Sequence, residues 1–150
     1  MKLHKQLKFL TIFFFTTIFL FSYPSVKSSF AACANDTDNS GTCSGTIEIN
    51  DSGKTITNSG TINSTDGSYA AGSIGIYGKP AGTNNTIVNS GTINSTFLDG
   101  AIGIQSEGAN TTIINSGAIN ATAGPDPGAG VGINGWMNGD DAVITGLEIF

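Results

Sequence analysis

The chain has 150 residues, 21 of them glycine, and a formal net charge of −5. Beyond Ala31 the only basic residues are Lys54 and Lys79. All 11 acidic residues lie in this part, so its net charge is −9. Such a surface repels phosphate backbones, so the composition argues against a nucleic-acid partner.

Residues 1–31 have the three parts of a secretory signal peptide. Lysines in the first eight positions form a basic start, residues 9–23 form an apolar run rich in Phe, and small residues follow. The run is shorter than the ~20 residues needed to span a bilayer, which favours a signal peptide over a membrane anchor. We expect cleavage after Ala31 or after Ala34.

Residues 32–43 are predicted to be a polar, turn-rich lead-in that contains both cysteines, Cys33 and Cys43. In an exported protein such a pair predicts a small disulfide loop. Lipid attachment at Cys33 is an alternative, but Phe30 stands where a lipoprotein signal usually carries Leu. A metal site is disfavoured because two thiols without His leave a tetrahedral site half filled.

From residue 44 the sequence is built from repeats. Ser44–Asn50 alternates apolar and polar residues, like a half-buried strand. Fuller units follow, each with a Thr-Ile-x-Asn segment, a Ser-Gly corner, a second Ile-centred segment, a variable polar loop and an apolar-Gly-Ile triplet. The paired segments are Thr55–Thr65, Thr86–Thr96 and Thr112–Thr122, and the triplets are Ile74–Ile76, Ile102–Ile104 and Val131–Ile133.

These repeats predict an all-β fold, a right-handed parallel β-helix of about three to four coils with three short strands in each coil. Strands of about three to five residues are expected between Gly, Asn and Ser corners, and no segment has helical spacing. We expect the corner glycines to supply a positive φ. Stacked coils should form ladders of identical side chains, namely Ile56/Ile87/Ile113, Ile62/Ile93/Ile119 and Asn58/Asn89/Asn115.

The last part of the chain departs from the pattern. A loop with two prolines at 124–128 and the only Trp, Trp136, precede Asp140 and Asp141. Residues 142–149 then look like the beginning of a further repeat. A solenoid usually ends in a polar cap, so we expect residues 44–150 to be an incomplete array of repeats.

The residue types needed for catalysis do not form a recognisable set. The part beyond residue 31 has no His or Arg, and its corner serines repeat as scaffold residues would. Asp140–Asp141 is more typical of a solvated turn than of a catalytic carboxylate pair. Loop residues Asp66, Asp99 and Asp126 could line one edge and bind calcium, but the glycine-aspartate nonapeptide of calcium-binding rolls is absent. We predict no catalytic residue, no cofactor and no metal.

The aromatic residues in this part leave two interpretations open. Tyr69, Tyr77, Phe97 and Trp136 could be displayed on loops, where they would bind sugar or protein. Alternatively they could cover the ends of a thin core.

The Asn-Ser-Gly-Thr-Ile-Asn repeat behind a Phe-rich signal peptide resembles the N-terminal part of bacterial autotransporter (type V secretion) passenger domains, including adhesins of Gram-negative bacteria. The carriers are the three paired segments and the Ile-Gly-Ile triplets. The resemblance implies export, passage through the outer membrane with a translocator, and display of a β-helix at the cell surface. This family shares a scaffold and no catalytic motif, so no functional residue carries over. Its translocator barrel is absent here, and a longer gene or a partner would have to supply it.

We therefore expect a non-enzymatic, exported passenger at the cell surface, in the outer membrane or outside the cell. Its partners would be host cells, matrix or copies of itself. Two alternatives stay open: the scaffold part of a carbohydrate-active β-helix enzyme whose site lies outside this chain, and a truncated remnant without function. Function would lie where the copies differ, in the loops at 66–73, 97–101 and 123–130.

Overall fold

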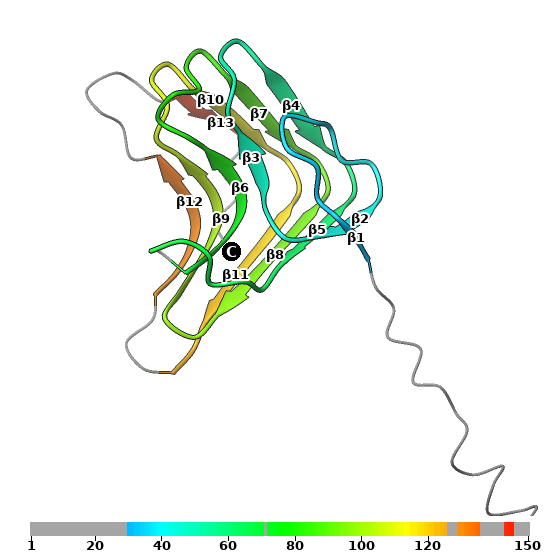
Figure 1. The fold of residues 1–150 in the computed structure, drawn as a ribbon, viewed down its shortest axis with the longest axis vertical. Helices are drawn as coiled ribbons and strands as arrows, with labels where there is room; N and C mark the ends of the chain where they lie inside the picture. The colour runs from blue at the N-terminus through cyan, green and yellow to red at the C-terminus, as the bar shows by residue number, and fades with distance from the viewer. Residues whose placement is uncertain (1–29, 71, 126–128, 136–142, 146–150) are drawn as a thin grey trace, which may run out of the picture.

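The computed structural model describes residues 30–70, 72–125, 129–135 and 143–145. In this part the chain is all-β, without a helix, and its parallel strands stack as a β-solenoid of about three turns (Figure 1). The predicted fold class is therefore confirmed. The expected signal peptide up to residue 29, Asp126, Trp136 and Asp140–Asp141 lie outside the described residues.

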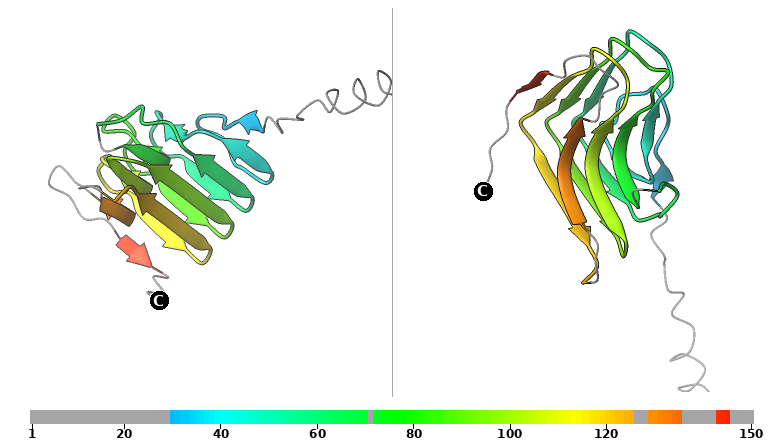
Figure 2. Two further views of the ribbon diagram at one scale, coloured as in Figure 1. Left: turned by 90° about the horizontal axis from the view of Figure 1, so that it is seen from below. Right: turned by 90° about the vertical axis from the view of Figure 1, so that its left-hand side faces the viewer.

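Three parallel sheets form the sides of the solenoid (Figure 2). The first sheet, called sheet A, contains in order β1 (Ala31–Ala32), β2 (Thr42–Ser44), β5 (Thr61–Ser64), β8 (Thr92–Phe97) and β11 (Ala118–Ala123). Sheet B contains β4 (Thr55–Asn58), β7 (Thr86–Asn89), β10 (Thr112–Asn115) and β13 (Val143–Thr145). Sheet C contains β3 (Ile47–Ile49), β6 (Ser73–Gly78), β9 (Gly100–Ser106) and β12 (Ala129–Gly135). Each full coil therefore runs through sheet B, then A, then C.

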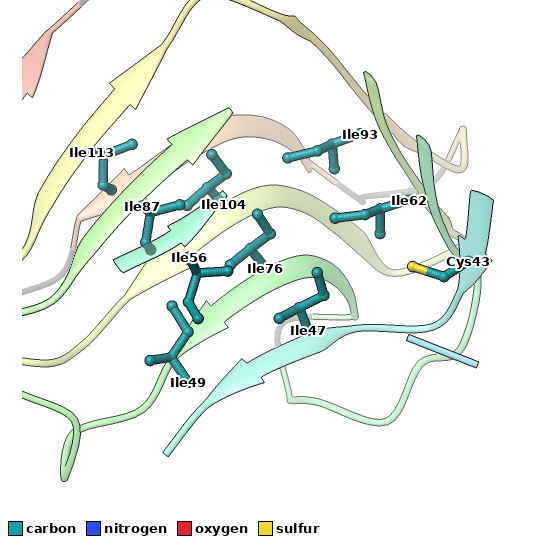
Figure 3. Packing of buried hydrophobic residues seen from close by; sticks show 10 residues of the cluster. All are labelled: Cys43, Ile47, Ile49, Ile56, Ile62, Ile76, Ile87, Ile93, Ile104 and Ile113. Atoms are coloured by element: carbon teal, nitrogen blue, oxygen red, sulfur yellow. The ribbon is translucent and has the colours of Figure 1, made fainter. Parts of the chain in front are cut away.

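The strand register places the same repeat position of successive coils side by side. Ile56 pairs with Ile87 and Ile87 with Ile113, and the Ile62 ladder runs in the same way. Five of these six inward isoleucines are almost completely buried and belong to the core in Figure 3, while Ile119 is partly buried and packs against it. Burial of each contributes about 1.5–3 kcal/mol, which is why the Ile positions recur in every coil. The predicted isoleucine ladders are confirmed.

The third predicted ladder is a column of buried amides at the corner between sheets B and A. Asn58 donates from Nδ2 to Oδ1 of Asn89 at 2.7 Å, and Asn89 donates likewise to Asn115 at 2.7 Å. The column also extends one step below the prediction, because Asn39 donates to Oδ1 of Asn58 at 2.8 Å. We call Asn39, Asn58, Asn89 and Asn115 the inner ladder.

The corner glycines are needed for a different reason from the one predicted. Gly60, Gly91 and Gly117 do not have a positive φ. They stack directly on one another, and a Cβ on Gly91 would lie 2.1 Å from the carbonyl oxygen of Gly60. Close contact between the coils, rather than backbone conformation, therefore excludes any side chain at these corners.

Two further predictions need correction. Ser44–Asn50 is not one strand, because the chain turns at Gly45, whose φ is +104°, between β2 and β3. The positive φ is thus found there and not at the Ser-Gly corners. In addition, β6, β8 and β11 have six residues and β9 and β12 have seven, so these strands exceed the predicted length. They continue into the predicted variable loops because β8 keeps pairing with β11 as far as Phe97.

Residues 32–43, predicted to be a lead-in, lie along the edge of the first coil and act as its cap. A disulfide joins Cys33 to Cys43, with the Cα atoms 4.9 Å apart. The segment takes up backbone hydrogen bonds that the first coil would otherwise leave open. Those bonds are Cys33 N to Ser44 O at 3.0 Å, Asn39 N to Thr57 O at 2.9 Å and Thr61 N to Gly41 O at 2.7 Å.

Candidate functional site

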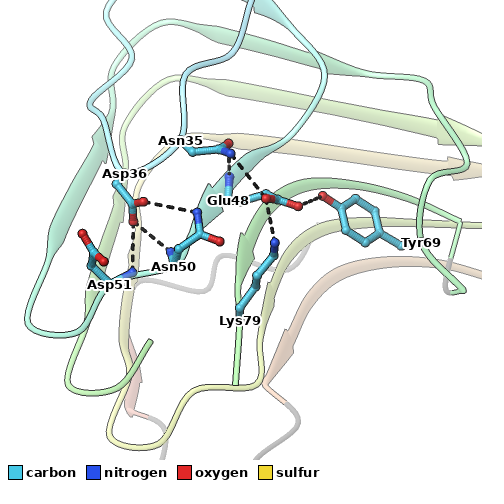
Figure 4. Close-up of polar contacts among 7 residues, drawn as sticks. All are labelled: Asn35, Asp36, Glu48, Asn50, Asp51, Tyr69 and Lys79. Atoms are coloured by element: carbon cyan, nitrogen blue, oxygen red, sulfur yellow. Dashed lines mark hydrogen bonds and ion pairs between the residues drawn. The ribbon is translucent and has the colours of Figure 1, made fainter. Parts of the chain in front are cut away.

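One polar cluster lies on the outer side of sheet C, around the carboxylate of Glu48 (Figure 4). Glu48 projects from β3, while Lys79 follows β6 and Tyr69 comes from the loop between β5 and β6. Lys79 donates to Oε2 of Glu48 at 2.7 Å, and the Tyr69 hydroxyl donates to Oε1 at 2.6 Å. Asn35 of the cap also donates to Oε2, at 3.3 Å. The cluster therefore joins the cap, the first coil and the following loop.

The charge state of this cluster follows from its contacts. Hydrogen bonds from Lys79 and Tyr69 hold the pKa of Glu48 below its ordinary value. Burial, together with the hydrogen bond to Glu48, raises the pKa of Tyr69 to about 12. At neutral pH Glu48 is thus a carboxylate that already accepts several hydrogen bonds, and it is poorly suited to act as a proton donor or acceptor.

A second tyrosine stands beside the first. The Tyr69 and Tyr77 rings meet edge to face, with their centroids 5.1 Å apart. Burial and hydrogen bonding to Glu107 raise the pKa of Tyr77 to about 12, and Gln105 donates to Oε1 of Glu107 at 2.6 Å. The ring contact and the hydrogen bonds hold the loop against the outer side of sheet C.

The cap is fixed by another carboxylate, also visible in Figure 4. Oδ1 of Asp36 accepts from the backbone N–H of Asn50 at 2.8 Å and of Asp51 at 3.3 Å. Burial alone would raise the pKa of Asp36, but these hydrogen bonds and the Asn50 side chain lower it below its ordinary value. In the same way Oδ1 of Asp38 accepts from the N–H of Thr57 at 2.7 Å. Side-chain oxygens here replace the carbonyls that a preceding coil would supply.

Of the acidic residues named as a conceivable calcium strip, Asp66 and Asp99 lie in the part that the structure describes, and Asp126 lies outside it. Asp66 accepts hydrogen bonds from the hydroxyl of Ser64, at the end of β5, at 3.4 Å and from that of Ser68 in its own loop at 3.1 Å. Asp99 lies between β8 and β9, and within the described ranges no three His, Cys, Asp or Glu residues come together in a way that could hold a metal ion.

Of the aromatic residues in these two interpretations, Tyr69 lies on the loop between β5 and β6, as the first expected, and Trp136 lies outside the described residues. Tyr77 belongs to β6 and Phe97 ends β8, so neither is displayed on a loop. The Phe97 ring packs tightly on Gly67, leaving no room there for a Cβ. The hydrogen bond of Tyr69 to Glu48 and the contact of Phe97 with Gly67 therefore tie residues 65–70 to strands β3 and β8.

The outer side of sheet A presents a second and more extensive arrangement. Its outward positions form columns across the coils, each made of one or two residue types. One column contains Thr42, Thr61, Thr92 and Ala118, the next contains Ser44, Asn63, Asn94 and Asn120, and a third contains Thr96 and Thr122. We call these residues the sheet A array. None of them is charged.

The asparagines of the array form an outer ladder. Asn94 donates from Nδ2 to Oδ1 of Asn63 at 2.9 Å, and Asn120 donates to Asn94 at 2.9 Å. The sequence shows these residues plainly, but the repeats were interpreted only as scaffold and function was expected in the loops. Period-two alternation was the signal that could have assigned Thr92, Asn94 and Thr96 to one outward face.

Comparison with protein families, with curated proteins and with solved structures finds no match in any of the three. The class of protein is therefore defined by its fold, a parallel β-solenoid built from imperfect repeats. The part of the chain that the structure describes contains no helix long and apolar enough to cross a bilayer.

Proposed function

We propose that this protein is an exported, non-catalytic β-solenoid passenger that acts in adhesion or self-association at the cell surface or outside the cell. The observation that carries the proposal is the sheet A array, where outward side chains repeat in register over successive coils. A side with groups that repeat from coil to coil suits contact with an extended partner. The resemblance of the repeats to autotransporter passengers supports the same function.

The polar cluster around Glu48 supports a non-catalytic role. Its carboxylate is occupied by Lys79, Tyr69 and Asn35, all of which belong to the scaffold or its cap. The groups that could do acid-base chemistry are thus used to hold the first coils together.

The processing of the chain is part of this proposal. Cleavage after Ala34 would remove Cys33 and with it the disulfide to Cys43. Cleavage after Ala31 keeps the bridge and the cap, so we propose Ala32 as the first residue of the exported chain. Amino-terminal sequencing of the exported protein tests this, and a chain that begins at Asn35 would contradict it.

Adhesion is tested with the full chain expressed in a Gram-negative host and its exported form purified. We expect this form to bind host cells, extracellular matrix or a second copy of itself, measured by cell-binding assays and by analytical ultracentrifugation. The outcome that contradicts the proposal is an exported form that remains monomeric and binds no cell or matrix component.

A further inference from the structure

The sheet A array is regular in two directions. Neighbouring strands in a sheet lie about 4.7–4.9 Å apart, and outward residues along one strand repeat every ~6.6–6.8 Å, twice the rise per residue. Along β8 the outward residues are Thr92, Asn94 and Thr96, which alternate with the buried Ile93 and Ser95. The outer side of sheet A is therefore a lattice of hydroxyl and amide groups.

The lattice is held in place before any partner arrives. Asn94, the middle amide of the outer ladder, donates once and accepts once within the ladder, and β-branched Thr has few rotamers. A partner would therefore bind without the usual entropic cost of ordering flexible side chains.

Hydrogen-bonding capacity is left over on this face. A primary amide has two donors and two lone pairs, so Asn94 keeps one donor and one lone pair beyond those used in the outer ladder. The hydroxyls of Thr61, Thr92 and Thr96 make no side-chain hydrogen bond to any other described residue. Both groups donate as well as accept, as sugar hydroxyls do.

The electrostatics of the face select against anionic partners. Beyond Ala31 the chain has a net charge of −9, yet the sheet A array has no ionisable side chain. The charged groups Glu48, Lys79 and Glu107 lie in and beside the strands of sheet C instead. An acidic polymer would be repelled by the whole molecule without a local cation to hold it.

We propose that the sheet A array binds neutral polysaccharide, with sugar hydroxyls taking up the remaining capacity of the Thr and Asn side chains. This deepens the proposed function, on which it rests, by naming the class of partner. A protein partner is disfavoured because the array has no aromatic residue, Met or Arg, the types that dominate protein interfaces.

The test uses the exported chain with its disulfide intact and a matched pair of triple variants. T61V/T92V/T96V removes three hydroxyls from sheet A and keeps the side-chain shape and strand propensity. T55V/T86V/T112V removes three hydroxyls from one column of sheet B, where the three threonines pair in register over successive coils. Thermal unfolding and circular dichroism check that both variants keep the fold.

The probes are the neutral polymers dextran, laminarin, cellulose and chitin and the anionic polymers alginate and heparin, in affinity electrophoresis or in sedimentation with insoluble polymer. We expect at least one neutral polymer, and no anionic one, to retain the chain. The sheet A variant should bind at least about tenfold more weakly, since each lost hydrogen bond weakens binding severalfold. The sheet B variant should bind like the unmodified chain.

Several results would overturn the inference: no retention by any neutral polymer, retention by anionic polymers only, adsorption to ice crystals only, or equal loss in both variants. Cell binding and self-association are measured in parallel on the same proteins. If these survive in the sheet A variant while no neutral polymer binds, the inference fails and the proposed adhesive function stands. If the unmodified chain binds neither cells, matrix, a second copy nor neutral polymer, both fail.

Discussion

The inner and outer ladders use the same residue in different surroundings. Asn58 and Asn89 of the inner ladder are completely buried, whereas Asn94 and Asn120 lie on the solvent side of sheet A. The amide hydrogen bonds are 2.7 to 2.8 Å long in the inner ladder and 2.9 Å in the outer one. The direction also reverses: the inner amides donate toward later coils and the outer amides donate toward earlier ones.

The two ladders therefore have different roles: the inner one stabilises the fold, and the outer one keeps hydrogen-bonding groups accessible to solvent. A buried amide has no water to replace a lost partner, so the inner ladder must be complete in every coil. An exposed amide exchanges water for its neighbour at little net gain. The inner ladder therefore stabilises the stack, and the outer ladder mainly fixes the orientation of groups that face solvent.

Replacing one inner amide should give the largest effect. Asn89→Ala leaves Nδ2 of Asn58 and Oδ1 of Asn115 without partners inside the protein. We expect the free energy of unfolding to fall by about 2–6 kcal/mol, from the cost of two buried polar groups without partners. Urea denaturation measures this loss. The matched control is Asn94→Ala, which should cost less than ~1 kcal/mol, and equal losses would refute the contrast between the ladders.

Opening the disulfide should weaken the inner ladder at its base. The bridge between Cys33 and Cys43 closes the loop that carries Asn39, the first amide of the ladder. We expect C33S/C43S to lose about 2–4 kcal/mol of unfolding free energy. Hydrogen exchange should show faster exchange first in β3 and β4, whose edges the cap protects. Exchange that increases uniformly through all coils would contradict this role of the cap.

The corner between the two ladders gives a smaller expected change. In Gly91→Ala the new Cβ would lie 2.1 Å from the Gly60 carbonyl oxygen, so the coils must separate locally. We expect a loss of about 1–3 kcal/mol. Gly41→Ala at the base of the same column meets nothing within 4 Å and should be neutral or stabilising by up to ~1 kcal/mol. Thermal unfolding of both variants decides whether contact or backbone freedom requires the corner glycines.

The outer side of sheet C should respond to alkaline pH. The part beyond Ala31 contains only Tyr69 and Tyr77 as tyrosines, and both have their pKa raised to about 12. Because the folded pKa is the higher one, their contribution to stability is complete below the ordinary pKa near ~10 and is lost as pH rises toward ~12. Phenolate absorbance should therefore rise near pH 12, and a midpoint near ~10 in the folded chain would contradict the burial of these rings.

Much of the fold follows from the sequence because each coil repeats the same spacing of Ile, Asn, Ser and Gly. The spacing of Ile56, Ile62 and their copies was sufficient to predict parallel stacking and the isoleucine ladders, which the register confirms. The cap was missed because Asn35, Asp36 and Asp38 have no apolar partner and no repeat to align with. Their oxygens act only through backbone N–H groups that become neighbours after folding.

The candidate sites were harder to predict for a related reason. Glu48, Tyr69 and Lys79 come from two coils and a loop, and nothing in their spacing shows that they meet. The corner glycines were correctly placed, but their cause was not, since a stacked glycine and a turning glycine look alike in a sequence. Only the contact between Gly60 and Gly91 tells the two apart.

The unequal number of residues in successive coils has an evolutionary consequence. Equivalent inner amides are 31 residues apart between the first pair of coils and 26 apart between the next, yet the strand register is the same. The additional residues lie in the loops between the strands, so the strands of each coil keep the same pairing positions. The two faces by which a coil contacts its neighbours are therefore nearly the same in every coil. A duplicated coil would therefore pair with its neighbours without further change. The number of coils in the solenoid can thus change by recombination within the gene, and no new contact surface has to evolve.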